Sequence, residues 1–139
     1  MRRVLVDTGP LVAILSTDDQ HHDLCVSTLR ELPGPLVSCW PVLTEVAWLL
    51  RRHARVQQQF FAAIGAGFLQ LASLTNADAK VIAELMAKYE NIRPQLADAA
   101  LVYLSERDGI DTIFTLDRRD FSVYRRANKR GFHILPQIG

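Results

Sequence analysis

The sequence predicts an α/β fold in which helices alternate with the strands of a mostly parallel, five-stranded sheet. Two observations support this fold class. Short β-rich runs alternate with runs of helical spacing, and no internal repeat, low-complexity stretch or linker interrupts the 139 residues. A chain of this length builds one well-packed core, so we expect a single domain over residues 1–139.

Local signals place each element in order. Five β-rich runs are expected to be strands, at residues 3–6, 36–39, 68–72, 112–115 and 132–135. Six runs with helical spacing lie between them, at residues 10–16, 19–32, 41–52, 56–64, 76–89 and 94–107. Residues that begin or end helices stand at their boundaries: Pro10 and Pro41 in first turns, Asp18 or Asp19 and Thr75 or Asn76 at caps, and Gly109 after the last helix.

Composition excludes several classes of protein. Hydrophobic residues make up 49% of the chain and charged residues 22%, which is typical of a globular domain and not of a disordered chain, a coiled coil or collagen. No apolar run approaches the roughly 20 residues of a membrane helix, and no signal-peptide core follows Met1. We therefore expect a cytoplasmic protein that does not contact a membrane.

Cysteine and histidine give no metal or redox motif. Cys25 and Cys39 lack the paired spacing of a zinc or thioredoxin-like site, and the four histidines show no metal-binding spacing. Two buried thiols are expected in a reducing compartment, although the sequence leaves a disulfide between them open.

Four acidic residues stand where a functional site is expected. Ligands of parallel sheets bind beyond the carboxyl ends of the strands, and Asp7 and Asp117 follow the first and fourth predicted strands. Glu45 and Asp98 lie on helices that are apolar nearly all round, which indicates burial. Any one of these acids could pair with a base or face water, but four gathered carboxylates would repel one another. A divalent cation such as Mg²⁺ or Mn²⁺ would relieve that repulsion and suit hydrolysis of a phosphodiester.

Four motifs resemble those of the PIN domain family, and most closely its VapC-type toxin ribonucleases. They read VLVDTGPLVA, LTEV, LADAALV and FTLDRRDF, at residues 4–13, 43–46, 96–102 and 114–121. The resemblance implies a PIN-like three-layer fold with strand order 3-2-1-4-5, which would put Asp7 beside Asp117. It also implies an endoribonuclease that depends on Mg²⁺ or Mn²⁺, with the metal held by Asp7, Glu45, Asp98 and Asp117.

Three further residues are secondary candidates for the site. Thr115 matches the small hydroxyl residue that precedes the fourth acid of the family, and Thr8 could likewise orient a ligand or a water by hydrogen bonds. Asp120 is an extra acid within the fourth motif, so either Asp117 or Asp120 could reach the metal. We favour Asp117 because it lies nearer the end of the strand.

The resemblance leaves more than one function open. A VapC-type toxin implies an RNA substrate, a homodimer and a cognate antitoxin protein. The alternatives are a PIN nuclease of RNA processing or DNA repair without an antitoxin, and a non-catalytic PIN-fold binding module. An aspartic protease is excluded because it needs two Asp-Thr-Gly triplets on a nearly all-β chain, and here one triplet opens a helix-rich chain.

Two surface features bear on the partners. The net charge is only +1, but with four of the 15 acids in one site the remaining surface is basic. Basic residues follow the helix of Glu45 and the strand before Asp117; they are Arg51, Arg52, Arg55, Arg118, Arg119, Arg125, Arg126, Lys129 and Arg130. The second feature is an apolar stripe of Val56, Phe60, Phe61, Ile64 and Phe68, which is either part of the core or an interface for another protein.

Overall fold

A wholly parallel sheet organises the chain, as the alternation of strands and helices predicted. The computed structural model describes residues 2–126 and 130–137. Five strands pair in the order β3-β2-β1-β4-β5, and all four pairings are parallel. The strands are β1 (Val4–Val6), β2 (Leu36–Ser38), β3 (Gln70–Leu71), β4 (Thr112–Phe114) and β5 (His133–Leu135). The strand order that the resemblance implied is therefore confirmed.

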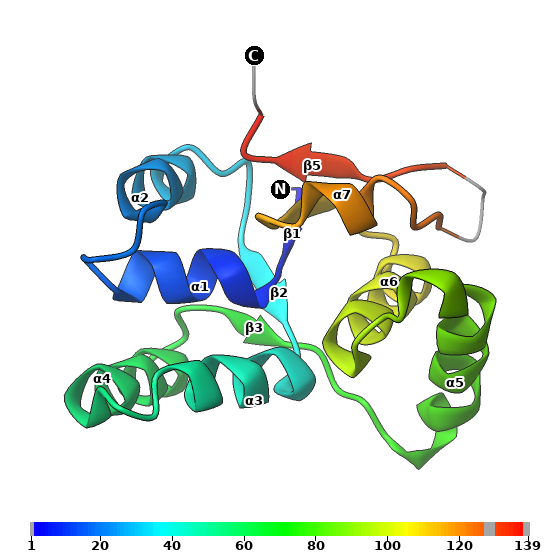
Figure 1. Ribbon diagram of the computed structural model, residues 1–139, viewed down its shortest axis with the longest axis horizontal. Coiled ribbons are helices and arrows are strands. Elements are labelled where there is room, and N and C mark those ends of the chain that lie inside the picture. Colours follow the sequence, from blue (N-terminus) through cyan, green and yellow to red (C-terminus); the bar gives the residue numbers. More distant parts are fainter. Residues whose placement is uncertain (1, 127–129, 138–139) are drawn as a thin grey trace.

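Helices lie on both sides of this sheet and make three layers. They are α1 (Thr8–Leu15), α2 (His22–Arg30), α3 (Trp40–Leu49), α4 (Ala54–Gly65), α5 (Ala79–Lys88), α6 (Leu96–Asp108) and α7 (Arg118–Phe121), with short 3₁₀ turns η1 (Asn76–Asp78) and η2 (Glu90–Ile92). Figure 1 shows α1 and α2 to one side of the central strands and α5 and α6 to the other. α3 contacts both α1 and α6, and so bridges the two groups. No helix within the described ranges is long and apolar enough to cross a membrane.

The boundaries at Thr75 and Gly109 form as predicted, α1 gains a cap that was not predicted, and α2 begins after His21 and not at Asp18 or Asp19. The side chain of Asp7 accepts a hydrogen bond from the Thr8 backbone N–H and caps α1. Thr75 and Asp78 form a reciprocal capping box at η1, which leads directly into α5. Gly109 ends α6 with a φ of 67°, a left-handed conformation that glycine adopts without a steric penalty. These caps fix where α1 begins, where the turn into α5 begins and where α6 ends.

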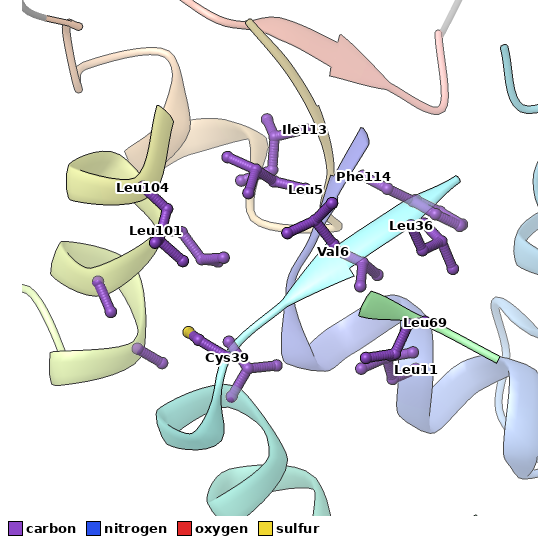
Figure 2. Close-up of a cluster of buried hydrophobic side chains, with 14 of the residues drawn as sticks. Leu5, Val6, Leu11, Leu36, Cys39, Leu69, Leu101, Leu104, Ile113 and Phe114 are labelled. Atoms are coloured by element: carbon purple, nitrogen blue, oxygen red, sulfur yellow. The ribbon is translucent and has the colours of Figure 1, made fainter. Parts of the chain in front are cut away.

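The hydrophobic core fills the space between the sheet and the helices. All three residues of β1 are fully buried, and Ile113 and Phe114 of β4 are buried beside them. Figure 2 shows Leu5 and Val6 among side chains of α1 and α6, including Leu11 and Leu101. A buried β1 in the middle of the sheet gives the site at its carboxyl end a rigid support.

Both cysteines belong to this interior. Cys25 and Cys39 are buried and carry free thiols, so the prediction of two thiols is confirmed and the disulfide is not formed. Burial raises the pKa of each thiol to about 11, which keeps both protonated at neutral pH.

The prediction that the helix of Glu45 is buried nearly all round was wrong. Val42, Leu43 and Val46 of α3 point into the core, but Trp48 is 63% exposed and Leu49 is 50% exposed. The buried residues lie on one side of the helix, and Trp48 and Leu49 lie on the side that faces away from the core. Glu45 itself is half-buried, at the border between the two sides.

The apolar stripe on α4 is mostly core. Phe60 is fully buried, and Val56, Ile64 and Phe68 are partly buried and pack against the core. Phe61 alone departs from this arrangement, since it is 39% exposed while its ring meets the edge of Phe60 at a centroid distance of 5.5 Å. An interface built on the whole stripe is therefore excluded.

Candidate active site

The site begins where β1 and β4 end side by side. β1 pairs with β4 in parallel, and the backbone N–H of Asp7 donates to the carbonyl oxygen of Phe114 at 3.0 Å. This bond continues the ladder by one residue and fixes Asp7 next to the segment that carries Thr115 and Asp117. The sequence prediction that these strand ends meet is confirmed by the parallel register.

Thr115 connects the two acids at these strand ends. Its hydroxyl donates to Oδ2 of Asp7 at 2.9 Å and accepts from the backbone N–H of Asp117 at 3.0 Å. The other oxygen of Asp7, Oδ1, accepts from the backbone N–H of Thr8 at 2.8 Å. Thr115 is fully buried and Asp7 is only 7% exposed, so these bonds hold Asp7 in one orientation.

A short helix that the sequence analysis missed brings in Asp120. Oδ1 of Asp117 accepts from the backbone N–H of Asp120 at 3.1 Å and thereby caps α7. The tight turn folds the Asp120 carboxylate back toward Asp117. Aspartate followed by a short polar run is a capping signal, and it could have indicated this turn.

Asp98 reaches the site from α6. It lies in the first turn of that helix, flanked by the buried Ala97 and Ala99, and is 9% exposed. The hydroxyl of Tyr124 contacts Oδ2 of Asp98 at 3.4 Å, from the segment that follows α7. Tyr124 is itself buried against Tyr89 and Phe121, whose rings meet it edge to face. No sequence signal marked Tyr124 as a neighbour of Asp98, because the contact depends on how α7 packs.

All four predicted acids, and Asp120, line one cavity of about 560 Å³. We call it the acid pocket; its lining residues are Asp7, Gly9, Glu45, Arg93, Gln95, Asp98, Leu116, Asp117 and Asp120. One carboxylate oxygen each from Asp98, Asp117 and Asp120 lies within 4.8 Å of the others. Asp7 and Glu45 face the same pocket from outside this triplet. The structure therefore brings both Asp117 and Asp120 to the acid pocket, so both could reach a metal there.

Thr8, the remaining secondary candidate, is not part of the pocket lining. Its hydroxyl is buried, and it makes no hydrogen bond to any residue within the described ranges. The backbone N–H of Thr8, in contrast, supports Asp7 directly. A role for the Thr8 hydroxyl in orienting a ligand or a water therefore stays a prediction.

Burial, with repulsion between neighbouring carboxylates, raises the pKa of Asp7, Asp98 and Asp120. Burial raises the pKa of Asp7 to about 6, with the charges of Glu45 and Asp117 adding to the effect and the hydrogen bonds from Thr8 and Thr115 opposing it. Burial also raises the pKa of Asp98 to about 7, and repulsion from Asp7 and Asp117 contributes. The pKa of Asp120 is raised too, by burial and by Asp117. Two buried carboxyl groups in one pocket are therefore costly to ionise.

Salt bridges do not relieve this cost. The ion pairs formed within the described part of the chain join Arg107 to Asp78 and Asp108, and the acids of the pocket take no part in them. A surface or salt-bridge role therefore does not describe Asp7 and Asp98. Five carboxylates line one pocket, and those of Asp98, Asp117 and Asp120 place oxygens less than 5 Å apart, which fits the hard oxygen ligation of Mg²⁺ or Mn²⁺.

The predicted basic residues have varied roles. Arg118 donates to the Pro136 carbonyl oxygen at 2.6 Å, and one nitrogen of Arg125 donates to three backbone carbonyls nearby. Arg51 stacks on the ring of Trp48 at 4.0 Å. Lys129 lies outside the described residues. The cation that lines the acid pocket is Arg93, which the sequence analysis did not select.

Comparisons with known proteins agree with the geometry. The profile of the PIN domain matches residues 4–127 of the chain. The ribonuclease VapC26 of Mycobacterium tuberculosis (strain ATCC 25618 / H37Rv) is 28% identical over 135 residues, which make up 96% of this chain and 100% of that protein.

Two solved structures share the fold. The crystal structure of Mycobacterium tuberculosis VapC20, described as a Sarcin-Ricin loop cleaving toxin, matches with a TM-score of 0.75 at 20% identity, over 84% of this chain and 91% of that one. A toxin-antitoxin complex from Klebsiella pneumoniae matches with a TM-score of 0.64 at 17% identity, over 86% of this chain and 90% of that one. At these identities the likeness concerns the fold alone.

Proposed function

The chain belongs to the PIN domain family, and from that premise we propose that it is a VapC-type endoribonuclease that hydrolyses RNA phosphodiesters with a divalent cation. One observation carries the proposal. Asp7 and Asp98 are buried, unpaired carboxylates whose pKa is raised, and they face the same pocket as Glu45, Asp117 and Asp120. Burying several carboxylates together costs free energy, and apolar residues would serve a purely structural role better. The cluster therefore indicates a functional role.

Mg²⁺, or Mn²⁺ in its place, is the cofactor that we propose for the acid pocket. Asp7, Glu45, Asp98 and Asp117 would hold it, and Asp120 is a further ligand candidate because its carboxylate lies with those of Asp98 and Asp117. When bound, the cation would activate a water and stabilise negative charge on the phosphate during hydrolysis. The reaction adds the oxygen of water to phosphorus and breaks one bridging P–O bond.

Residues around the acid pocket fix the orientation of its carboxylates. Thr115 fixes the Asp7 carboxylate and the backbone of Asp117 together, and the Asp117 cap sets the position of Asp120. The Tyr124 hydroxyl contacts Oδ2 of Asp98. Such hydrogen bonds to ligand carboxylates keep their oxygens aimed at one point, and that alignment is worth tenfold or more in metal affinity or activity.

The partners that we propose are RNA, a second copy of the chain and an antitoxin protein. The RNA substrate and the antitoxin are supported by the likeness to VapC26 and to a toxin-antitoxin complex. We also propose that the protein is cytoplasmic and that residues 1–139 form one domain.

An exposed apolar surface supports the proposal that the chain pairs with a second copy. This surface is not the apolar stripe on α4. Trp40, Trp48 and Leu96 are each more than half exposed. Two hollows of about 530 Å³ each adjoin here: Trp40 and Leu96 line both, and Trp48 lines the one that extends to Glu45, while the other extends to Ile82. We call this surface the tryptophan face. Projecting rings beside apolar hollows suit a two-fold contact, in which each copy fills the hollows of the other.

Cleavage assays test the proposed activity directly. The purified chain is expected to cut single-stranded RNA in Mg²⁺ or Mn²⁺, to lose that activity in EDTA, and to regain it when the cation is restored. A single-stranded DNA of the same sequence serves as the substrate control. Cleavage that continues in EDTA would contradict the proposal.

A further inference from the structure

Arg93 stands at the rim of the acid pocket and is its one basic residue within the described part of the chain. We propose that Arg93 binds the RNA phosphate that enters this pocket and holds it against the acids. The proposal rests on the nuclease function proposed above and deepens it, since it assigns the residue that recognises the substrate's charge.

The backbone presents Arg93 in an unusual way. Arg93 has φ 50° and ψ 62°, and it is the one non-glycine residue with positive φ among those described. A long side chain adopts this left-handed conformation at a cost in free energy, and such residues concentrate at functional sites. The fold therefore fixes Arg93 in a conformation that glycine would adopt at a lower cost in free energy.

Neighbouring residues explain how the turn is held. The backbone N–H of Arg93 donates to the Glu90 carbonyl oxygen at 3.1 Å and closes η2. Pro94 follows, and a residue before proline is disfavoured in the right-handed helical conformation. The chain then enters α6, which carries Asp98 into the pocket. Arg93 and Asp98 are thus joined by one short, constrained segment.

The guanidinium of Arg93 has no other task in the structure. Within the described ranges it takes part in no ion pair and no side-chain hydrogen bond, although five carboxylates line the same pocket. Arg118 and Arg125, by comparison, are occupied with backbone carbonyls. An exposed, uncommitted guanidinium at the rim is available to an anion that arrives from solvent.

A phosphodiester is the anion that best suits Arg93 and the acid pocket. The acids of the pocket would repel an RNA backbone wherever a bound cation does not cover them. A guanidinium offers two parallel N–H donors, which match two non-bridging oxygens of a phosphate better than the single ammonium of lysine does. Arg93 would hold the phosphate at the pocket and oppose the negative charge that grows during hydrolysis.

Matched variants separate binding from folding. Arg93→Gln removes the charge, Arg93→Lys keeps it without the paired donors, and Arg93→Gly removes the side chain while suiting the left-handed backbone. Arg30→Gln, at the exposed end of α2, makes the same charge change away from the pocket. We expect Arg93→Gly to melt close to the unsubstituted protein, because relief of the left-handed conformation offsets its greater freedom when unfolded.

The first measurement is cleavage of a labelled single-stranded RNA in Mg²⁺. Loss of one charged hydrogen-bonding group is expected to lower kcat/KM about 10- to 100-fold in Arg93→Gln and in Arg93→Gly, with Arg93→Lys in between. Arg30→Gln should stay within about twofold of the unsubstituted protein, as a surface change does. Equal rates for Arg93→Gln and Arg30→Gln would overturn the proposal.

The second measurement is the salt dependence of RNA binding, read by fluorescence anisotropy in an Asp98→Asn background that limits cutting. Each phosphate contact to a single strand contributes about 0.7 to the slope of log affinity against log salt. Arg93→Gln and Arg93→Gly should lower the slope by about that amount, and Arg30→Gln should leave it unchanged. An unchanged slope at Arg93 would overturn the proposal even if cleavage fell.

The two measurements also separate this proposal from the one it rests on. Failure of the unsubstituted protein to cut RNA would refute the nuclease function, and the slope would still decide whether Arg93 binds phosphate. Absence of RNA binding altogether would overturn the assignment of Arg93. A loss of activity in Arg93→Gln with a lowered melting temperature, and full activity in Arg93→Gly, would show a purely structural role.

Discussion

The hydroxyl of Thr115 donates a hydrogen bond to Oδ2 of Asp7 at 2.9 Å, between residues 108 positions apart in the chain. The hydroxyl oxygen of Thr115 also accepts a hydrogen bond from the backbone N–H of Asp117. One small side chain thus ties the first and fourth acids of the motif pattern together at the ends of β1 and β4. The bond also lowers the pKa of Asp7 against the larger effect of burial, and so favours the ionised form that a cation requires.

Replacing Thr115 with valine tests this link. Thr115→Val keeps the shape but removes the donor to the buried Asp7 Oδ2 and the acceptor of the partly buried Asp117 N–H, so we expect a loss of about 1–3 kcal/mol in the free energy of unfolding and a roughly tenfold or larger drop in RNA cleavage. Thr115→Ser should retain most of both. Thr112→Val is the matched control, because Thr112 is a buried threonine at the other end of β4. Activity in Thr115→Val equal to that in Thr112→Val would refute the link.

The raised pKa values predict a pH dependence of stability without metal. The pKa is about 6 for Asp7 and about 7 for Asp98, above the ordinary value of 3.8, so the folded chain keeps protons that the unfolded chain releases. The free energy of unfolding should therefore fall as pH rises from about 4 to about 7, by an amount on the order of a few kcal/mol. Urea denaturation in EDTA at several pH values measures it.

Two variants isolate the source of that pH dependence. Asp98→Asn should flatten the dependence and be at least as stable as the unsubstituted protein near pH 7, since it removes a buried charge. Asp23→Asn, on the exposed surface of α2, should leave the profile unchanged. Identical profiles for Asp98→Asn and the unsubstituted protein would show that the carboxyl of Asp98 is not destabilised by the fold.

Phe60 and Phe61 should differ sharply despite being neighbours. Phe60 is fully buried and Phe61 is 39% exposed. Phe60→Ala is expected to lower the free energy of unfolding by about 3–5 kcal/mol, while Phe61→Ala should cost about 1 kcal/mol or less. Urea denaturation compares the two directly, and equal losses would contradict the assignment of the stripe to the core.

The tryptophan face should control self-association. A double variant, Trp40→Ser with Trp48→Ser, is expected to remain folded and to elute as a monomer, because both rings are exposed in the single chain. Leu24→Ser changes an exposed apolar residue on α2 and should leave the dimer intact. Size-exclusion chromatography with light scattering provides the mass. A double variant that keeps the mass of the unsubstituted protein would place the contact elsewhere.

The positions of the acids could be predicted because they depend on local signals and on sheet order. Asp7 follows a buried β-rich run, and parallel strands carry such residues to one edge, so placing Asp7 beside Asp117 required only the strand order. That order came from the family resemblance, since the alternation of strands and helices fits several parallel topologies. Periodicity likewise identified Asp98 as an acid on a buried helix, which α6 confirms.

The parts that could not be predicted depend on packing between elements. Trp48 and Leu49 are apolar yet exposed, because hydrophobic character alone does not tell a core from an uncovered surface. Tyr124 reaches Asp98 from the segment that follows α7, and this four-residue helix is too short to give a periodic pattern. Arg93 enters the pocket through a left-handed turn, and no propensity indicates that conformation for arginine.

The central claim is that the acid pocket binds a divalent cation and cuts RNA, and Asp98→Asn tests it most directly. Cleavage of a single-stranded RNA in Mg²⁺ is measured for the unsubstituted protein, for Asp98→Asn and for the control Asp23→Asn. We predict that Asp98→Asn loses about 10²-fold or more in rate while Asp23→Asn stays within about twofold, and that EDTA abolishes cleavage in all three. Cleavage by Asp98→Asn at the rate of the unsubstituted protein would contradict the account.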